Sequence, residues 1–371
     1  MEFSEIHPDC PKYRVRLFLS VDLTNSTSFK SSRPPHTWVP IFRDFYSQFT
    51  ETFQRSYISE IERSQASDDH LSAAVCEKLK LRKPKFWKTV GDEILFVNRV
   101  NSCYEVFFMV SAFSEALKEY GRILSSEKNT ETLGVKGAGW LASFPYPNIA
   151  IEMPRETASK ENGLSEREAI EESADQDPSQ HEFLGKGLDY GFRIAGNSSN
   201  DFFAISPGLA DIISRANVNE DYANLGVKIK VRSPVKLKGV LDGRDYPVVG
   251  IPIDSSQQWS DYRRLQDKLL GTDQTNNQDL RNYFRHFMEL HDIEQPTLPV
   301  RPEDKELAAP PYYLKKYVPK WMEAQKEVTD QDAMIHEGDT IGEADGDEPD
   351  EKTFSEAVRN FRSVIEKYKN S

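Results

Sequence analysis

The feature that most constrains the fold is a short apolar run near the start of the chain, at residues 14–22. It reads RVRLFLSVD, is rich in branched and aromatic side chains, and is followed by the polar segment LTNSTS. Branched and aromatic residues favour strands, and a polar segment with Thr, Asn and Ser favours the start of a helix. The pattern therefore predicts a strand that ends at Asp22 and leads into a loop and a helix.

A second pattern, at residues 41–53, places apolar and aromatic side chains three and four residues apart. This spacing is typical of a helix that packs one face against a sheet. The residues concerned are Ile41, Phe42, Phe45, Tyr46, Phe49 and Phe53. We expect them to belong to the core.

Strand-like and helix-like runs alternate irregularly as far as residue 252. Residues 84–97 form two strand-like runs around Val90-Gly91-Asp92-Glu93, which is a hairpin turn sequence. The alternation predicts an α+β fold for residues 1–252, with a ferredoxin-like sheet layered with helices. The chain has no glycine loop of the P-loop or Rossmann kind.

Two stretches differ in composition from the rest. Residues 151–181 are acidic and almost free of aromatic side chains, so we expect a mobile acidic surface insertion that adds nothing to the core. Residues 253–371 combine helix-like, proline-rich and acidic runs, and residues 353–368 again have an apolar helical face. We expect a mostly helical C-terminal extension with linker segments, docked on the core or on a second subunit.

Charge and hydropathy limit the partners that the chain binds directly. Its 371 residues carry 47 basic and 60 acidic side chains, a net charge of -13, and no basic cluster stands out. We therefore expect no nucleic-acid surface. The chain has no long apolar run and no apolar signal core, which predicts no membrane insertion. Its three cysteines are far apart, without zinc-finger spacing, which indicates reduced thiols in a cytoplasmic protein.

Four short motifs carry candidate chemistry when they are taken together. They are the strand end at Asp22, the turn KTVGDE with Asp92, the run GKGLDYGFR with Asp189 and Arg193, and the late LKG around Lys238. Each alone has a common structural role, as a helix cap, a hairpin turn or a solvated helical side chain. In their order and internal spacing, however, they resemble the class III adenylate and guanylate cyclases.

That resemblance implies a metal site and a triphosphate site. Asp22, Asp92 and the backbone carbonyl of Leu23 are expected to bind two divalent cations, Mn²⁺ or Mg²⁺, for which hard oxygen ligands are suited. Ser26 and Thr27 lie in the segment that opens the helix. They are expected to hold the phosphates together with unpaired backbone N–H groups.

The resemblance, which covers about residues 14–252, also assigns roles to the later motifs. Arg193 is the expected transition-state clamp, because its planar guanidinium spans two phosphoryl oxygens, and Lys238 is expected to hold the terminal phosphates. Asp189 stands where most of these cyclases have an Asn that orients the ribose. It is expected to bond the ribose or act as a base, with a plain helix N-terminal acid as the alternative. In the family these groups face the metal ligands of the opposite subunit, which implies a homodimer with shared active sites.

Lys88 and Glu182 occupy the positions that read the base edge in purine-specific relatives. An ammonium donor beside a carboxylate acceptor suits adenine or cytosine, and it suits uracil if the two groups exchange targets. Glu182 is one methylene longer than the usual Asp, so it would crowd adenine but reach a smaller ring. The alternative is that Glu182 is a strand-edge acid in water, and that aromatic neighbours such as Phe42, Tyr46 or Trp87 close the space that a purine needs.

The segments FLSVDLTNSTSFK and FWKTVGDEILF look like those of the bacterial antiphage pyrimidine cyclases of the Pycsar systems. This resemblance implies a lyase that converts UTP or CTP, with UTP favoured, into a 3′,5′-cyclic pyrimidine nucleotide and pyrophosphate. A separate effector would sense the product. The alternatives are a bacterial adenylate cyclase that makes cyclic AMP, and an inactive cyclase fold that senses nucleotides. The metal-binding aspartates, the arginine and the phosphate-binding lysine are all present, which argues against the inactive form.

Overall fold

The computed structural model describes residues 10–66, 72–153, 167–218, 227–254, 257–271, 276–301 and 307–326. Its described strands form a seven-stranded sheet in the order β2-β3-β1-β4-β7-β9-β8, and a separate pair of β5 and β6. The strands are β1 (Arg14–Thr24), β2 (Phe86–Val90), β3 (Glu93–Val100), β4 (Gly134–Phe144), β5 (Asn148–Glu152), β6 (His181–Gly185), β7 (Phe202–Ile205), β8 (Lys230–Lys236) and β9 (Asp245–Pro252).

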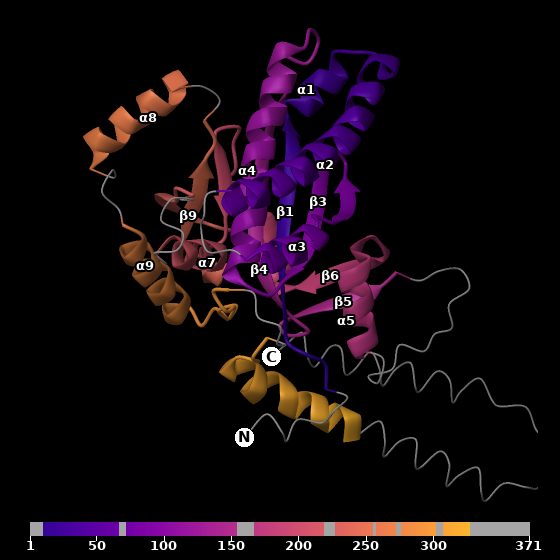
Figure 1. Cartoon of the computed structure of the whole chain (residues 1–371), viewed down its shortest axis with the longest axis vertical. Helices are drawn as coiled ribbons and strands as arrows, with labels where there is room; N and C mark the ends of the chain where they lie inside the picture. Colours follow the sequence, from indigo (N-terminus) through magenta and orange to yellow (C-terminus); the bar gives the residue numbers. More distant parts are fainter. Residues whose placement is uncertain are drawn as a thin grey trace, which may run out of the picture. The chain divides into compact units, whose positions relative to one another are not determined.

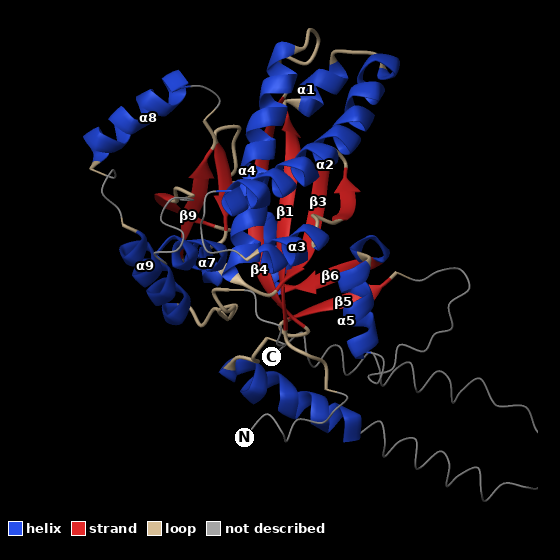
Figure 2. Ribbon diagram, viewed as in Figure 1, coloured by secondary structure: helices blue, strands red, loops and turns tan. Residues whose placement is uncertain are grey.

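The chain divides into two compact units, residues 1–319 and 320–371, and the second is helical over residues 320–326. In the first unit, the long helices α2 and α4 pack on each other in front of the strands (Figures 1 and 2). The helices are α1 (Ser26–Ser31), α2 (Pro35–Ala66), α3 (Ala73–Leu81), α4 (Cys103–Ser126), α5 (Arg167–Gln176), α6 (Lys186–Ala195), α7 (Pro207–Val218), α8 (Gln257–Leu270) and α9 (Asn277–Leu290).

The first four strands follow the ferredoxin-like β-α-β-β-α-β order. β1 lies between β3 and β4 and is antiparallel to both, while β2 pairs with β3 in the hairpin. Helices α2 and α4 form the two crossovers, after β1 and after β3. The expected fold class is therefore confirmed: an α+β domain with a ferredoxin-like sheet, followed by mostly helical C-terminal segments.

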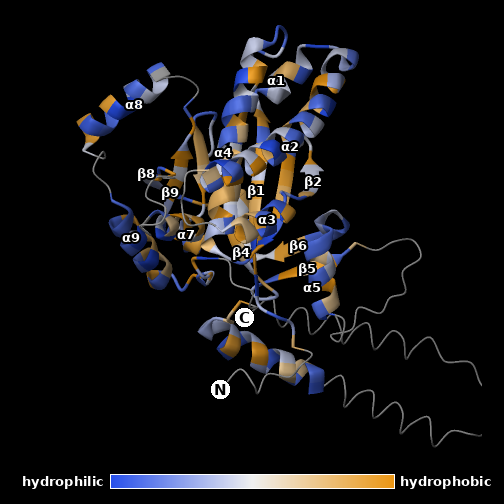
Figure 3. Cartoon of the chain, in the orientation of Figure 1, coloured by the Kyte–Doolittle hydropathy of each residue, from blue (hydrophilic) through white to orange (hydrophobic). Residues whose placement is uncertain are grey.

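The first strand, β1, is buried on both faces from Arg14 to Val21, including its two arginines. Figure 3 shows the central strands as the most hydrophobic part of the fold. On one face, aromatic side chains of α2 reach the sheet, and the rings of Phe53 and Phe96 meet edge to face at 5.2 Å. Phe42, Phe45 and Phe49 are also buried, so the predicted core helix is confirmed for its phenylalanines, whereas Ile41 and Tyr46 are only half-buried.

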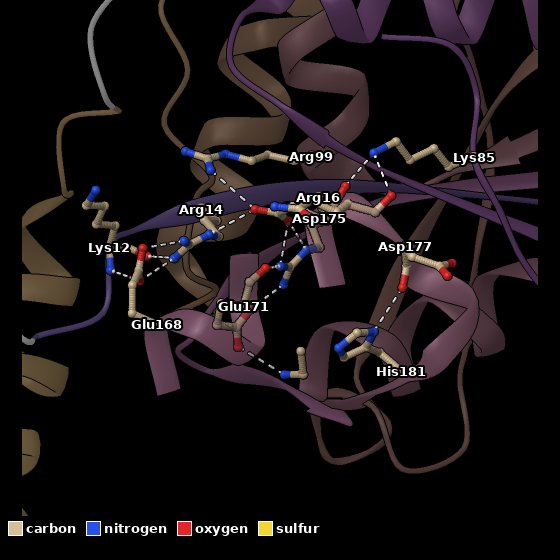
Figure 4. A network of polar contacts seen from close by, with 12 residues as sticks. Lys12, Arg14, Arg16, Lys85, Arg99, Glu168, Glu171, Asp175, Asp177 and His181 are labelled. Atoms are coloured by element: carbon tan, nitrogen blue, oxygen red, sulfur yellow. Dashed lines mark hydrogen bonds and ion pairs between the residues drawn. The ribbon is translucent and has the colours of Figure 1, made fainter. Parts of the chain in front are cut away.

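The other face of the sheet is covered by β5, β6, α5 and α6. Here the prediction of a mobile acidic insertion at residues 151–181 is wrong for the described part, which contains the end of β5, helix α5 and the first residue of β6. The acids of α5 form ion pairs with Arg14 and Arg16, both buried in β1 (Figure 4). These partners lie 154 to 161 residues earlier, so local composition could not reveal them. Residues 154–166 lie outside the described residues.

The first compact unit continues past residue 252, where a domain boundary was expected, to Pro319. Helix α9 packs against α7, and the N–H of Cys103 donates to the carbonyl of Pro299 at 2.9 Å. Among the described C-terminal residues, α9 and the segment around Pro299 are therefore docked on the core. The acidic run and the apolar pattern at residues 353–368 lie outside the described residues.

The three cysteines, Cys10, Cys76 and Cys103, are free and buried. Burial raises the pKa of the Cys10 and Cys103 thiols to about 11, so both stay protonated and unreactive at neutral pH. Within the described ranges, no helix combines the length and the apolarity that crossing a bilayer requires.

Candidate functional site

Asp22 lies near the end of β1, where the strand leaves the core. The preceding residues of the strand are buried, whereas the Asp22 side chain is 29% exposed. Its cross-strand neighbours are Glu93 in β3 and Lys136 in β4. The Lys136 ammonium lies 3.0 Å from one Asp22 carboxylate oxygen. The strand end therefore presents a carboxylate that is partly buried and forms an ion pair with the Lys136 ammonium.

Asp92 lies at the tip of the hairpin between β2 and β3. Gly91 has a φ of +63°, which costs glycine little and lets the chain reverse within two residues. The Tyr46 hydroxyl of α2 donates to the Gly91 carbonyl at 2.6 Å, and the Leu23 N–H donates to the Asp92 carbonyl at 3.3 Å. The turn is thus held both by α2 and by the end of β1, so Asp92 is fixed beside Asp22.

The two aspartates open on one hollow of about 460 Å³, together with the start of α1. Asn25 makes the connection from β1 to α1 possible, because it adopts the left-handed conformation at a φ of 62° and its Nδ2 donates to the Thr132 carbonyl at 2.9 Å. The hollow is lined by Asp22, Leu23, Thr24, Asn25, Ser26, Thr27, Val90, Asp92, Glu93 and Lys136. The structure therefore brings together all the residues that were predicted to bind metal, and two of those predicted to bind phosphate.

The carboxylates of the hollow repel one another. Burial raises the pKa of Asp22; Lys136 lowers it, and the nearby Asp92 raises it further. Burial also raises the pKa of Glu93, with Ser20 lowering it and the Asp22 charge raising it. A divalent cation between Asp22 and Asp92 would relieve this repulsion.

The oxygen ligands of the hollow suit Mg²⁺ or Mn²⁺. They are too few for a metal ion whose ligands all come from the protein. In the part of the chain that the structure describes, no group of three or more His, Cys, Asp or Glu side chains is arranged to hold a metal ion. Mg²⁺ does not need one, because it commonly takes one or two carboxylates and completes its shell with water and substrate phosphates. Asp22 and Asp92 provide such a pair.

Lys88 in β2 and Glu182 in β6 form an ion pair, although 94 residues separate them. The Lys88 ammonium donates to the two Glu182 carboxylate oxygens at 2.8 and 2.6 Å. Both side chains remain about one third exposed, at 31% and 32%. The two residues that were predicted to read a base are therefore neighbours, and a ligand can reach both.

The remaining predicted residues lie away from the hollow. Asp189 and Arg193 are exposed and stand one turn apart on α6. Gly191 forms the inner side of that helix, where a Cβ would fall within 2.4 Å of the Trp140 ring. Lys238 is exposed in the turn that follows β8. None of these three polar side chains lines the hollow of its own chain.

A second cavity, of about 340 Å³, lies beneath α6, between β4 and residues 288–296. Trp140 and Tyr190 contribute to its wall. None of the predicted site residues lines it, so the hollow at Asp22 is the candidate site.

Sequence reasoning missed two basic groups next to the aspartates: Lys136, which lines the hollow, and Lys30, which pairs with Asp92. Lys136 comes from the run LGVKGAG, where it is a lone cation in an otherwise apolar and glycine-rich strand. Its position opposite Asp22 follows from the register of β1 against β4, which a single sequence does not reveal. Lys30, in the last turn of α1, lies 3.6 Å from Asp92.

No protein-family model and no curated protein matches this chain. Among solved structures, it is similar to the adenylyl cyclase CyaB from P. aeruginosa, with a TM-score of 0.39 and 10% identity over 66% of this chain and 97% of that one. It is also similar to the guanylate cyclase domain of RhGC from Catenaria anguillulae in complex with GTP, with a TM-score of 0.36 and 10% identity over 66% and 100% of the two chains. For the guanylyl cyclase Cya2, the TM-score is 0.35 and the identity 14%, over 66% and 93%.

Proposed function

We propose that the protein is a class III nucleotidyl cyclase, a lyase that forms a 3′,5′-cyclic nucleotide and pyrophosphate from a nucleoside triphosphate. The observation that carries the proposal is the position of Asp22 and Asp92 at neighbouring strand ends, in one hollow with the start of α1. This arrangement sets a pair of hard anionic ligands next to hydroxyl groups that suit a phosphate chain. The order of the four sequence motifs supports the same function.

The chemistry explains why these groups are needed. Ring closure requires the ribose 3′-oxygen to attack the α-phosphorus in line with the leaving pyrophosphate, so negative charge grows on the attacking and leaving oxygens. Two bound Mg²⁺ or Mn²⁺ ions would stabilise both ends. Asp22 and Asp92 would hold them, with the Leu23 carbonyl as a further ligand. Ser26 and Thr27 would orient the phosphates.

The exposed positions of Arg193, Asp189 and Lys238 support a homodimer with shared sites. None of the three lines the hollow of its own chain. In a two-fold dimer, a second copy can supply them to that hollow. Arg193 would then span the transition-state oxygens, Lys238 would hold the terminal phosphates, and Asp189 would bond a ribose hydroxyl.

The Lys88–Glu182 pair supports recognition of the base, and we propose a pyrimidine. A base edge with an acceptor beside a donor can replace the contacts within this pair without leaving either charge unpaired. The length of Glu182 favours a small ring. The resemblance to pyrimidine cyclases, which more often use UTP, makes cyclic UMP the favoured product, with cyclic CMP second. We further propose that this product is a second messenger in antiphage defence and acts on a separate effector protein.

A single assay tests both the reaction and the base. Purified protein is incubated with each of the four nucleoside triphosphates and Mn²⁺, and the products are separated by chromatography. We expect a cyclic pyrimidine nucleotide with an equal amount of pyrophosphate. Cyclic AMP alone would replace the pyrimidine assignment by an adenylate cyclase. Binding of triphosphate without any product would leave an inactive nucleotide sensor.

A further inference from the structure

Trp87 precedes Lys88 in β2 and is only 2% exposed. Its indole N–H donates to the carbonyl of His181, directly before Glu182, at 2.8 Å. Its ring also meets the ring of Phe183, directly after Glu182, with centroids 5.1 Å apart. One buried side chain thus contacts both chain neighbours of Glu182.

The same ring also fixes the partner of Glu182. The Lys88 ammonium lies 4.4 Å from the centroid of the Trp87 ring, within the range of a cation–π interaction. The register of β2 against β3 shifts between Phe86 and Lys88, which makes Trp87 the extra residue of a β-bulge. Bulges redirect side chains next to functional sites. Here the bulge buries the indole and leaves Lys88 facing Glu182.

The segment that Trp87 holds is fixed by further hydrogen bonds. The Lys85 ammonium donates to the carbonyls of Asp175 and Gln176, at the end of α5, at 2.5 and 3.1 Å. The His181 ring nitrogen Nδ1 lies 2.9 Å from the Asp177 carbonyl oxygen (Figure 4). The His181 carbonyl is therefore part of an anchored segment, and its bond to Trp87 defines the separation of β2 and β6.

We infer that Trp87 is a positioning residue for base selection, which holds Glu182 against Lys88 in the geometry that reads the nucleotide. The inference rests on the proposed function and adds to it a residue that sets specificity without contacting the base. Direct contact, the role considered for Trp87 from the sequence, is excluded by the burial of its ring. Trp87 acts from beneath the Lys88–Glu182 pair.

The first test is Trp87→Phe, which keeps an aromatic ring but removes the N–H and leaves the buried His181 carbonyl without that donor. The ratio of kcat/KM for the favoured triphosphate to that for the next one should fall about ten-fold, the order expected when a buried hydrogen bond loses one partner. The loss should appear mainly in KM. The value of kcat at saturation should stay within a few-fold, because the hollow at Asp22 is unchanged.

Trp140→Phe is the matched control. Trp140 is 1% exposed and belongs to the same buried cluster as Trp87. Its Nε1 has no hydrogen-bond partner among the described residues, so the same chemical change removes no such bond. This variant should keep the base preference even if it loses stability. If Trp87→Phe also keeps the preference, Trp87 serves packing alone and the inference is overturned.

A second measurement does not depend on turnover. The coupling free energy between Lys88 and Glu182 is obtained from urea unfolding of Lys88→Met, Glu182→Gln and the double variant. We expect coupling in the wild type and in Trp140→Phe, and its loss in Trp87→Phe. Unchanged coupling in Trp87→Phe would overturn the positioning role even in an active cyclase. If no triphosphate is cyclised but the coupling is lost as expected, the proposed function fails and the positioning role stands.

Discussion

Arg16 of β1 and Glu171 of α5 form an ion pair at 2.5 Å in which neither side chain is more than 1% exposed. Arg16 also donates to the Glu171 carbonyl at 2.8 Å and pairs with Asp175 at 2.6 Å. The second carboxylate oxygen of Glu171 accepts the N–H of Ala150, in β5, at 3.1 Å. One acid of α5 therefore joins this helix to the central sheet and to the smaller one.

Replacing Glu171 with Ala should destabilise the fold strongly. The change leaves the buried Arg16 guanidinium without its closest partner, and removing one member of a buried pair costs about 3–5 kcal/mol. Urea unfolding measures the loss. Glu172→Ala is the matched control, because Glu172 is the next residue of α5 and is exposed, so it should change stability by less than about 0.5 kcal/mol. Equal stability of the two variants would show that the pair does not hold α5.

Acid should weaken the same network through Glu168. Burial raises the pKa of this carboxyl, but hydrogen bonds from the Arg14 guanidinium and the Lys12 N–H, with the charges of both residues, hold it below its usual value of 4.5. A lowered folded-state pKa adds stability that is present above the unfolded pKa and is lost as the pH falls through the folded pKa.

Glu168→Gln removes this titration. The variant should be less stable than the wild type at pH 7 and should lose less stability between pH 5 and pH 3. Urea midpoints of both proteins at several pH values check the expectation. Parallel pH profiles for the two proteins would exclude Glu168 as a source of acid sensitivity.

The elements that could be predicted are those whose side chains repeat with a local period. The aromatic face of α2 and the apolar run of β1 both appear where the sequence indicates them, as does the turn at Gly91. The positions of Asp22 and Asp92 follow from such elements, because each lies where a strand ends or reverses. That the two aspartates lie close together follows only when β1 is also known to pair with β3. The ferredoxin-like order of strands predicts this pairing.

Helix α5 could not be predicted because an acidic stretch, judged from the sequence alone, is expected to face solvent. Its apolar face is small, with Ile170 and Ala174 buried, and its acids form ion pairs with charged groups of β1. Arg14 and Arg16 alternate with apolar residues, a pattern that usually indicates a solvent-facing side of a strand. Only the tertiary structure shows that α5 covers that side.

Asp22→Asn should abolish cyclisation and leave the fold intact. The substitution removes a charged ligand of the proposed metal site, at a position outside the core. We therefore expect a loss of about 4 kcal/mol or more of transition-state stabilisation, a rate decrease of thousands-fold. Turnover in saturating Mn²⁺ and the unfolding midpoint are measured together. Asp44→Asn, at an exposed position of α2, serves as the control. Near-normal activity of Asp22→Asn would refute the metal assignment.

Mixing two inactive variants tests whether the sites are shared. In the proposed homodimer, Asp22→Asn and Arg193→Ala would each damage both sites of their own dimer. In a mixed dimer, however, one of the two sites would contain neither lesion, provided that the two residues come from different subunits. Activity should return as subunits exchange, towards about a quarter of the wild-type rate, since half of the dimers are then mixed and each has one intact site. Exchange demonstrated by differently tagged subunits, without recovery of activity, would contradict the shared site.

The last prediction concerns Glu182, whose carboxylate accepts two hydrogen bonds from Lys88 while remaining 32% exposed. If the pair reads the base, Glu182→Ala should leave metal and phosphate binding in place and reduce the preference for the favoured triphosphate. A hydrogen bond to a charged group contributes about 1.5–3 kcal/mol, so the ratio of kcat/KM values should fall by tens-fold to a hundred-fold.

Glu152→Ala is the control for that experiment, because Glu152 is an exposed acid in β5, paired in register with His181 beside Glu182. It should leave the ratio unchanged, which separates base recognition from a general effect of negative charge near the site. If Glu182→Ala behaves like Glu152→Ala, Glu182 is a strand-edge acid in water. Selection of a pyrimidine would then have to come from the size of the base pocket. The rings of Phe42 and Trp87 are buried in the core, so of the three aromatic residues considered only the half-buried Tyr46 could line that pocket.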